Sequence, residues 1–122
     1  MTYTPDANKK FQKEINSGTA AVVLLCLLDQ AEEPMYGYQI TKLMEAADSR
    51  VMMMKQGALY PVLRSLENSG LLSSQVDPSV SGPPRRYYRI TAAGKESLLH
   101  WIEIWAHTKS FVDNILQGKK DA

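Results

Sequence analysis

Residues 56–90 read QGALYPVLRSLENSGLLSSQVDPSVSGPPRRYYRI. The first part of this stretch carries an apolar stripe at helical spacing, made of Leu59, Val62, Leu63 and Leu66. Ser69 and Gly70 then supply a helix stop. Two strand-like runs follow, LLSSQV and RRYYRI, around a tip rich in proline, serine and glycine. The order predicts a helix followed by a β-hairpin with a long tip.

Two further helices are expected upstream. The first covers residues 11–28, and its second half is the apolar run from Ala20 to Leu28. A helix that is apolar all round must be covered on every side, so a second subunit is expected to contribute to that cover. A polar break follows, and residues 36–47 then predict an amphipathic helix. Residues 1–10 are expected to form a flexible arm, and residues 48–54 fit either a short strand or a turn.

A long last helix is expected over residues 92–116, with Thr91 as its N-cap. Gly94 stands where a capping box would place glutamate. The apolar residues of this helix recur near the 3.5-residue period of a coiled-coil seam. A two-fold dimer is the simplest way to cover them. The residues predicted to form the dimer interface are Leu98, Ile102, Trp105, Val112 and Ile115.

Three helices, a hairpin and a long helix predict a mainly α protein with a small β-hairpin. This is a winged helix-turn-helix with a long C-terminal dimerisation helix. The predicted organisation is an arm (1–10), a DNA-binding domain (11–90) and a dimerisation helix with a short tail (91–122).

Composition excludes several classes of protein. The single cysteine, Cys26, rules out an internal disulfide and fits a reducing compartment. The longest apolar run has nine residues, well below the roughly 20 needed to cross a bilayer, and no signal peptide is evident, so we expect a cytoplasmic protein without membrane contact. No catalytic motif is recognisable, so neither an enzyme nor a cofactor is expected. His100 and His107 are expected to be solvent-exposed rather than metal ligands.

Positive charge is concentrated in the middle of the chain. Residues 50–95 hold seven Lys or Arg against two Asp or Glu, whereas both flanks are net acidic. This pattern indicates a surface that faces a polyanion. The third helix is predicted to enter the DNA major groove, although Pro61 should bend or delay its first turn. Its predicted DNA contacts are Lys55, Gln56, Ala58, Tyr60 and Arg64.

The second half of the hairpin predicts the rest of the DNA interface. Alternate residues of a strand share a face, so Arg85, Tyr87 and Arg89 point one way and the two residues between them the other. One set should pack against the helices and the other should meet solvent or DNA. The predicted DNA contacts of this wing are Arg85, Arg86 and Tyr88.

Three blocks of the sequence closely resemble the PadR family of regulators. They are YGYQI (36–40), GALYPVLRSLENSGLL (57–72) and GPPRRYYRITAAG (82–94), and the similarity extends from about residue 19 to residue 116. The short C-terminal part resembles the LmrR-type branch. The resemblance implies a homodimeric repressor whose last helix packs on the first and last helices of the other subunit. It also implies that Trp105 stacks a flat aromatic ligand at the interface, whereas Trp101 has no counterpart there and could narrow or fill the channel.

The expected function is therefore a repressor that binds a pseudo-palindromic double-stranded DNA operator as a homodimer. A small aromatic effector, such as a drug or a phenolic compound, would bind at the interface and release the DNA. Two alternatives remain open. One is a winged-helix module that binds proteins instead of DNA, and the other is a small-molecule carrier without an operator.

Overall fold

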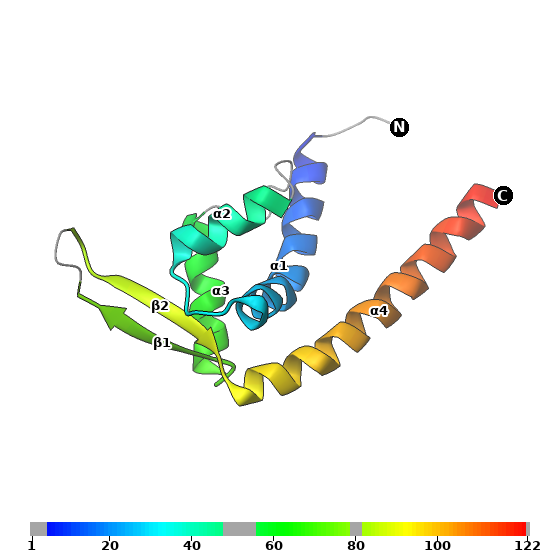
Figure 1. Ribbon diagram of the computed structural model, residues 1–122. Coiled ribbons are helices and arrows are strands. Elements are labelled where there is room, and N and C mark those ends of the chain that lie inside the picture. The colour runs from blue at the N-terminus through cyan, green and yellow to red at the C-terminus, as the bar shows by residue number, and fades with distance from the viewer. Residues whose placement is uncertain (1–4, 48–55, 79–81, 122) are drawn as a thin grey trace.

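The computed structural model describes residues 5–47, 56–78 and 82–121 of the chain. Its elements, in chain order, are α1 (Pro5–Gln30), α2 (Gly37–Ala47), α3 (Gln56–Asn68), β1 (Leu72–Asp77), β2 (Arg85–Ile90) and α4 (Ala92–Asp121). The predicted winged helix-turn-helix with a long last helix is thus confirmed. The hairpin extends from one side of the three-helix unit and α4 leaves from the other (Figure 1).

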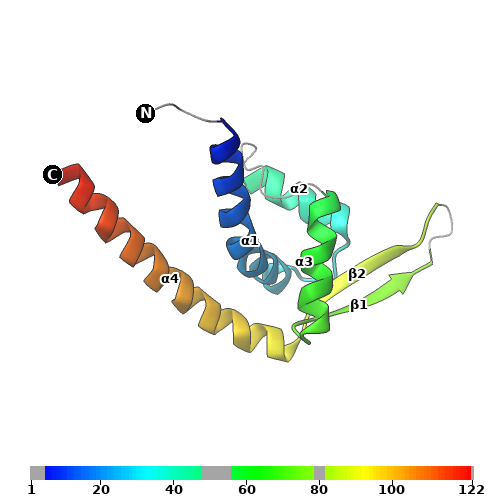
Figure 2. The same cartoon turned by 180° about the vertical axis from the view of Figure 1, so that it is seen from behind.

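One apolar core joins the first three helices, the hairpin and the start of α4. Figure 2 shows α1, α2 and α3 grouped on one side of the root of the hairpin. The largest fully buried side chains of this core are Leu24, Leu25, Ile40, Leu59 and Leu63. The apolar stripe predicted for α3 therefore faces inward, which leaves the opposite side of this helix free for solvent or a ligand.

The end of α3 is fixed by a Schellman motif. The Leu71 N–H donates to the Leu66 carbonyl at 3.0 Å and the Gly70 N–H donates to the Glu67 carbonyl at 2.9 Å. Gly70 has a φ of +80°, a conformation in which a side chain would be strained. The predicted stop is confirmed, and it turns the chain directly into β1.

The hairpin is antiparallel, with pairs that run from Leu72 with Ile90 to Asp77 with Arg85. On its other edge, β2 receives one further pairing from the connection between α1 and α2. The Met35 N–H donates to the Tyr88 carbonyl at 3.0 Å, and the Tyr88 N–H donates to the Met35 carbonyl at 2.8 Å. The wing is therefore tied to the α1–α2 connection through the main chain.

Thr91 caps α4 as predicted. Its hydroxyl accepts the Gly94 N–H at 3.0 Å and donates to the Gly70 carbonyl at 2.7 Å. Position 94 also has a packing role that capping rules do not reveal. A Cβ there would collide with the Leu71 carbonyl oxygen and with the Ile90 side chain. Glycine at this position lets the first turn of α4 lie against the segment that joins α3 to β1.

Two boundaries differ from those expected. The prediction of a flexible arm is wrong for residues 5–10, because α1 begins at Pro5. Proline suits a first helical position, and Asp6 complements the helix dipole there. At the other end, α4 continues to Asp121. The segment 48–54, left open between strand and turn, lies outside the described residues.

Candidate nucleic-acid interface

The outer face of α3 carries three of the side chains that were predicted to contact DNA. Ala58, Tyr60 and Arg64 are exposed, on the side opposite the buried leucines. Gln56 is the first residue of α3, whereas Lys55 lies outside the described residues. The helix runs continuously through Pro61, with no late start.

Tyr60 also links α3 to α2. Gly37, at the start of α2, is buried, and a Cβ built on it would lie 3.1 Å from the Tyr60 hydroxyl oxygen. The absence of a side chain at position 37 therefore lets Tyr60 lie across the first turn of α2. This contact fixes the position of the exposed part of the tyrosine ring on the outer face of α3.

On the face of the hairpin that meets α3, Tyr88 is only 3% exposed and belongs to the core. Burial raises the pKa of its hydroxyl, and the charge of Arg86 opposes this effect. The prediction that Tyr88 contacts DNA is wrong, because its ring is packed inside the protein. Strand alternation correctly separated Tyr88 from Tyr87, but it could not decide which of the two faces the core.

Arg86 lies on the same face as Tyr88 but is exposed. Its Nη1 donates to the Ser74 Oγ at 2.9 Å, and this hydroxyl donates to the Glu67 Oε2 at 2.6 Å. The relay joins both strands of the wing to the last turn of α3. Sequence reasoning missed Ser74 and Glu67. Predicting the relay requires both the register of the two strands and the position at which α3 ends.

The outward face of the wing carries an aromatic cluster, which we call the Tyr36 cluster; it comprises Tyr36, Tyr38, Tyr87 and the cations Lys42 and Arg85. The Arg85 guanidinium carbon lies 4.6 Å from the centroid of the Tyr36 ring. The Tyr87 ring meets the same ring edge-on, with centroids 5.3 Å apart. The Tyr38 ring stacks on the Tyr36 ring with centroids 6.4 Å apart, and the Lys42 Nζ lies 5.3 Å from the centroid of the Tyr38 ring. The cluster joins β2 to the start of α2.

The charge of α3 and the wing is not neutralised within the described part of the chain. Among those residues, no carboxylate lies within ion-pairing distance of the four arginines on these elements, Arg64, Arg85, Arg86 and Arg89. Arginines that keep their charge free on an exposed surface are suited to bind phosphate groups.

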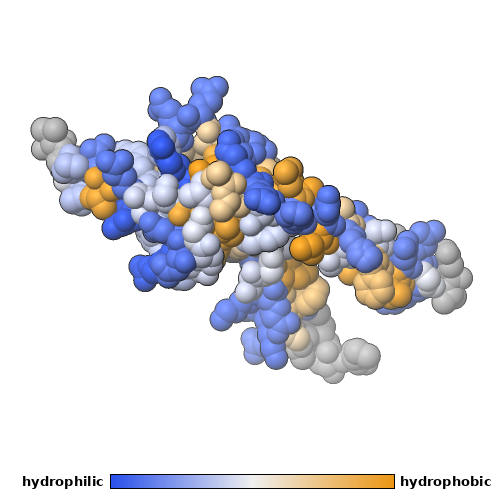
Figure 3. Space-filling view, turned by 90° about the horizontal axis from the view of Figure 1, so that it is seen from below, coloured by the Kyte–Doolittle hydropathy of each residue, from blue (hydrophilic) through white to orange (hydrophobic). Residues whose placement is uncertain are grey.

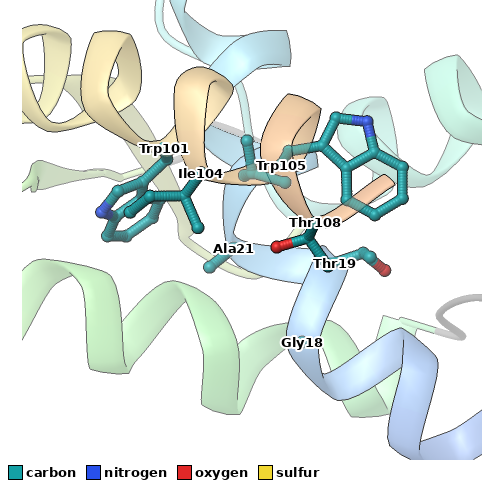
Figure 4. A pocket seen from close by; sticks show the side chains of 8 residues that line it. Gly18, Thr19, Ala21, Trp101, Ile104, Trp105 and Thr108 are labelled. Carbon is teal, nitrogen blue, oxygen red and sulfur yellow. The ribbon is translucent and has the colours of Figure 1, made fainter. Parts of the chain in front are cut away.

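A second feature lies on the opposite side of the molecule, where an apolar groove of about 430 Å³ separates α1 from α4. The α1 wall carries small residues, whereas the α4 wall carries both tryptophans, and Figure 4 shows the indoles at opposite ends with Ile104 and Thr108 between them. The residues that line the groove are Gly18, Thr19, Ala21, Val22, Trp101, Ile104, Trp105 and Thr108. Trp101 is half-buried and Trp105 is 47% exposed.

Most of α4 is exposed, including the positions predicted to form a dimer seam at Ile102, Trp105, Val112 and Ile115. Leu98 is an exception, because it is only 4% exposed and packs in the core of its own chain. Its assignment to the dimer interface is therefore wrong. Figure 3 shows apolar side chains gathered over the half of the molecule that contains α1 and α4. Sequence reasoning missed several exposed apolar residues of this half, namely Phe11, Ile15, Leu99, Ile104, Phe111 and Leu116.

The remaining candidate residues do not form a site within the described segments. Cys26 is partly buried on α1, where its sulfur accepts a hydrogen bond from Gln30 at 3.2 Å. His100 and His107 are exposed on α4, and no group of three or more potential metal ligands occurs among the described residues. None of the described helices combines the length and apolar character that a bilayer crossing requires.

Comparison with known proteins gives a consistent result. The family model described as the transcriptional regulator PadR-like family matches residues 24–100. The chain is 39% identical over 79 residues to the transcriptional regulator Rv3488 of Mycobacterium tuberculosis, which covers 65% of this chain and 70% of that protein. Members of this family are transcriptional regulators, so the prediction that the chain is not an enzyme is confirmed.

Two solved structures are similar along most of their length. A PadR family transcriptional regulator from Eggerthella lenta has a TM-score of 0.72 and 33% identity, covering 91% of this chain and 93% of that one. A transcriptional regulator from Clostridium thermocellum has a TM-score of 0.74 and 28% identity, covering 83% and 96%.

Proposed function

Because the chain belongs to the PadR-like family of transcriptional regulators, we propose that it is a repressor that binds a pseudo-palindromic operator as a homodimer. The observation that carries this proposal is the set of four arginines on α3 and the wing that have no carboxylate partner among the described residues. A winged helix-turn-helix presents these two elements to DNA.

The proposed role of each residue in DNA binding follows from the geometry of α3 and the wing. The outer face of α3 enters the major groove, where Arg64 binds guanine or phosphate and Tyr60 binds phosphate. Lys55 and Gln56 are further proposed contacts, because they precede and begin the helix and a helix N-terminus also favours phosphate. Arg85 and Arg86 of the wing contact the backbone beside the groove. The relay from Arg86 through Ser74 to Glu67 keeps this arginine beside α3.

The proposed dimer is formed by the exposed apolar sides of α1 and α4. The support for it is the set of large apolar side chains left exposed on these two helices, because large exposed apolar patches mark interaction surfaces. A second copy related by a two-fold axis would cover them. It would also place the two α3 helices about 34–36 Å apart, the distance of one turn of the duplex.

The groove between α1 and α4 is the proposed effector site. Its volume of about 430 Å³ falls in the range of small-molecule pockets, and its walls are mainly apolar. Trp105 would stack a flat aromatic compound of drug or phenolic type, with Trp101 closing the other end. Such a ligand releases DNA only if it binds more tightly to a dimer whose α3 helices have the wrong spacing.

The experiment that tests this function measures the affinity of the protein for the DNA upstream of its own gene at two salt concentrations, with a random duplex as control. We expect tight binding to the upstream fragment, with an affinity that falls steeply as salt rises. Equal and weak binding to both duplexes would contradict autoregulation and direct the search to a distant operator.

The groove also favours a second candidate function, that of a small-molecule carrier. A carrier would bind aromatic compounds tightly but would show neither an operator preference nor a steep salt dependence. A protein-binding winged-helix module would likewise lack the salt dependence. The DNA titrations at two salt concentrations therefore separate the repressor from both alternatives, and tight binding of aromatic compounds separates the carrier from the protein-binding module.

A further inference from the structure

Tyr36 lies between α1 and α2 and is not among the proposed DNA contacts. Its half-buried ring lies between two residues of β2, with the Arg85 guanidinium 4.6 Å from its centroid and the Tyr87 ring edge-on at 5.3 Å. The Tyr36 N–H donates to the Gln39 Oε1 at 3.1 Å, in the first turn of α2. Tyr36 is therefore attached to the helix-turn-helix on one side and to the wing on the other.

The wing depends on this attachment because it is a two-stranded hairpin, and an isolated hairpin of this kind is only marginally stable. The Met35–Tyr88 hydrogen bonds hold β2 by its main chain. One residue further along, the Tyr36 ring holds β2 by its side chains. Together the two contacts set the direction in which the strand leaves the body of the protein.

The cation–π contact also orients Arg85. A guanidinium that lies over an aromatic ring uses its face for the ring and keeps its N–H groups at the edge available for an anion. The long arginine side chain is thereby restricted before DNA arrives, so less of its conformational freedom is lost on binding.

We propose that Tyr36 is a positioning residue for DNA binding, whose ring fixes the direction of the wing through Arg85 and Tyr87. This inference rests on the proposed function, because it requires that the wing contacts DNA. Tyr36 itself touches no DNA in this arrangement. Its contribution is to hold the arginine and the strand in the geometry that binding requires.

The first test measures amide hydrogen exchange of β2 in the free protein. Tyr36→Leu removes both aromatic contacts, so we expect the amides of residues 85–88 to exchange about five to ten times faster. Tyr36→Phe keeps the ring and should behave as wild type. Tyr38→Leu is the matched control, since Tyr38 stacks on Tyr36 but has Lys42 as its cation–π partner, whereas Arg85 lies over Tyr36, and it should leave the exchange of β2 unchanged.

The second test measures operator binding by the same variants. Tyr36→Leu should weaken binding about three- to tenfold without changing the slope of log Kd against log salt, because no charge is removed. Arg85→Ala should weaken binding and also lower that slope by about one. The unchanged slope distinguishes a positioning residue from a phosphate contact.

The outcomes are separable. Unchanged β2 exchange in Tyr36→Leu would overturn the inference. If this variant does not fold, Arg85→Gln replaces it, because this exposed substitution removes the same cation–π contact and must also accelerate exchange. A wild-type protein without operator preference or salt dependence would contradict the proposed function instead, and the exchange experiment would still decide whether Tyr36 fixes the wing.

Discussion

Met35 and Tyr88 are joined by two main-chain hydrogen bonds, one of 3.0 Å from the Met35 N–H and one of 2.8 Å from the Tyr88 N–H. The side chain of Tyr88 then extends into the core. A single residue of β2 therefore links the wing to the α1–α2 connection through its backbone and to the apolar core through its ring. This arrangement explains why Tyr88 is buried although it lies in the positively charged middle of the chain.

Tyr88→Ala should strongly destabilise the protein. Removal of a buried aromatic ring leaves a cavity and costs about 3–5 kcal/mol, a large part of the roughly 5–15 kcal/mol by which small domains are stable. Denaturant unfolding at one fixed protein concentration measures the loss. Tyr87→Ala, at the neighbouring half-buried position, is the control and should cost less. Equal losses for both variants would contradict the assignment of Tyr88 to the core.

Gly94→Ala should destabilise the protein by about 1–3 kcal/mol, because the new methyl group meets the Leu71 carbonyl oxygen. Gly118→Ala, in the same helix, is the matched control. A Cβ at that position would have no described atom within 4 Å apart from its chain neighbours and the backbone of its own helix, so the alanine should stabilise α4 by about 0.5–1 kcal/mol. Thermal unfolding of the two variants should therefore shift in opposite directions. A rise in the unfolding temperature of Gly94→Ala would show that the approach of α4 to Leu71 is not close.

The sequence predicts that α3 and the two strands of the wing exist better than it predicts which face of each strand points to the core. The spacing of Leu59, Leu63 and Leu66 is sufficient to place the inner face of α3, because a helix has one period. A strand with aromatic residues on both faces is ambiguous, so Tyr88 was assigned to DNA and not to the core. Its backbone pairs with Met35, which is distant in sequence, and its ring belongs to a core that several elements form together.

Leu98 illustrates a second limit. It follows the same helical period as Ile102 and Ile115, yet it packs in the core of its own chain while the other two are exposed. Periodicity identifies an apolar stripe but cannot say whether another part of the same chain or another subunit covers it. That distinction depends on where α4 diverges from the body of the protein, a property of the fold as a whole (Figure 2).

Arg64→Ala should weaken operator binding and lower the slope of log Kd against log salt by about one, because one phosphate contact is lost. If Arg64 reads a base, the loss should instead be about 1–3 kcal/mol for the operator and small for random DNA. Lys109→Ala is the control, since this lysine pairs with Asp113 on α4, at 2.7 Å. Identical slopes and affinities for wild type and Arg64→Ala would remove Arg64 from the interface.

Ile115→Glu should dissociate the proposed dimer. Ile115 is 62% exposed in the single chain, so the substitution costs the monomer little. In a dimer it would bury a charge without a partner, which should raise the dissociation constant at least about 100-fold. Sedimentation equilibrium measures the change. His107→Glu, on the polar side of α4, is the control and should leave the mass unchanged. A dimer that persists in Ile115→Glu would place the interface elsewhere.

Trp105→Leu should reduce the affinity for flat aromatic compounds more than Trp101→Leu does. Both indoles line the groove (Figure 4), but Trp105 is the more exposed of the two and has a free ring face on which a ligand can stack. Loss of that stacking should cost about 0.5–1.5 kcal/mol beyond the lost apolar contact, or roughly a tenfold loss of affinity in all.

Titration of each variant with a planar dye, followed by the fluorescence of the dye, provides the measurement. The far-ultraviolet circular dichroism spectrum of both variants should match that of wild type, which serves as the folding control. A larger loss in Trp101→Leu would move the stacking site to the other end of the groove, and equal affinities in all three proteins would exclude the groove as the aromatic site.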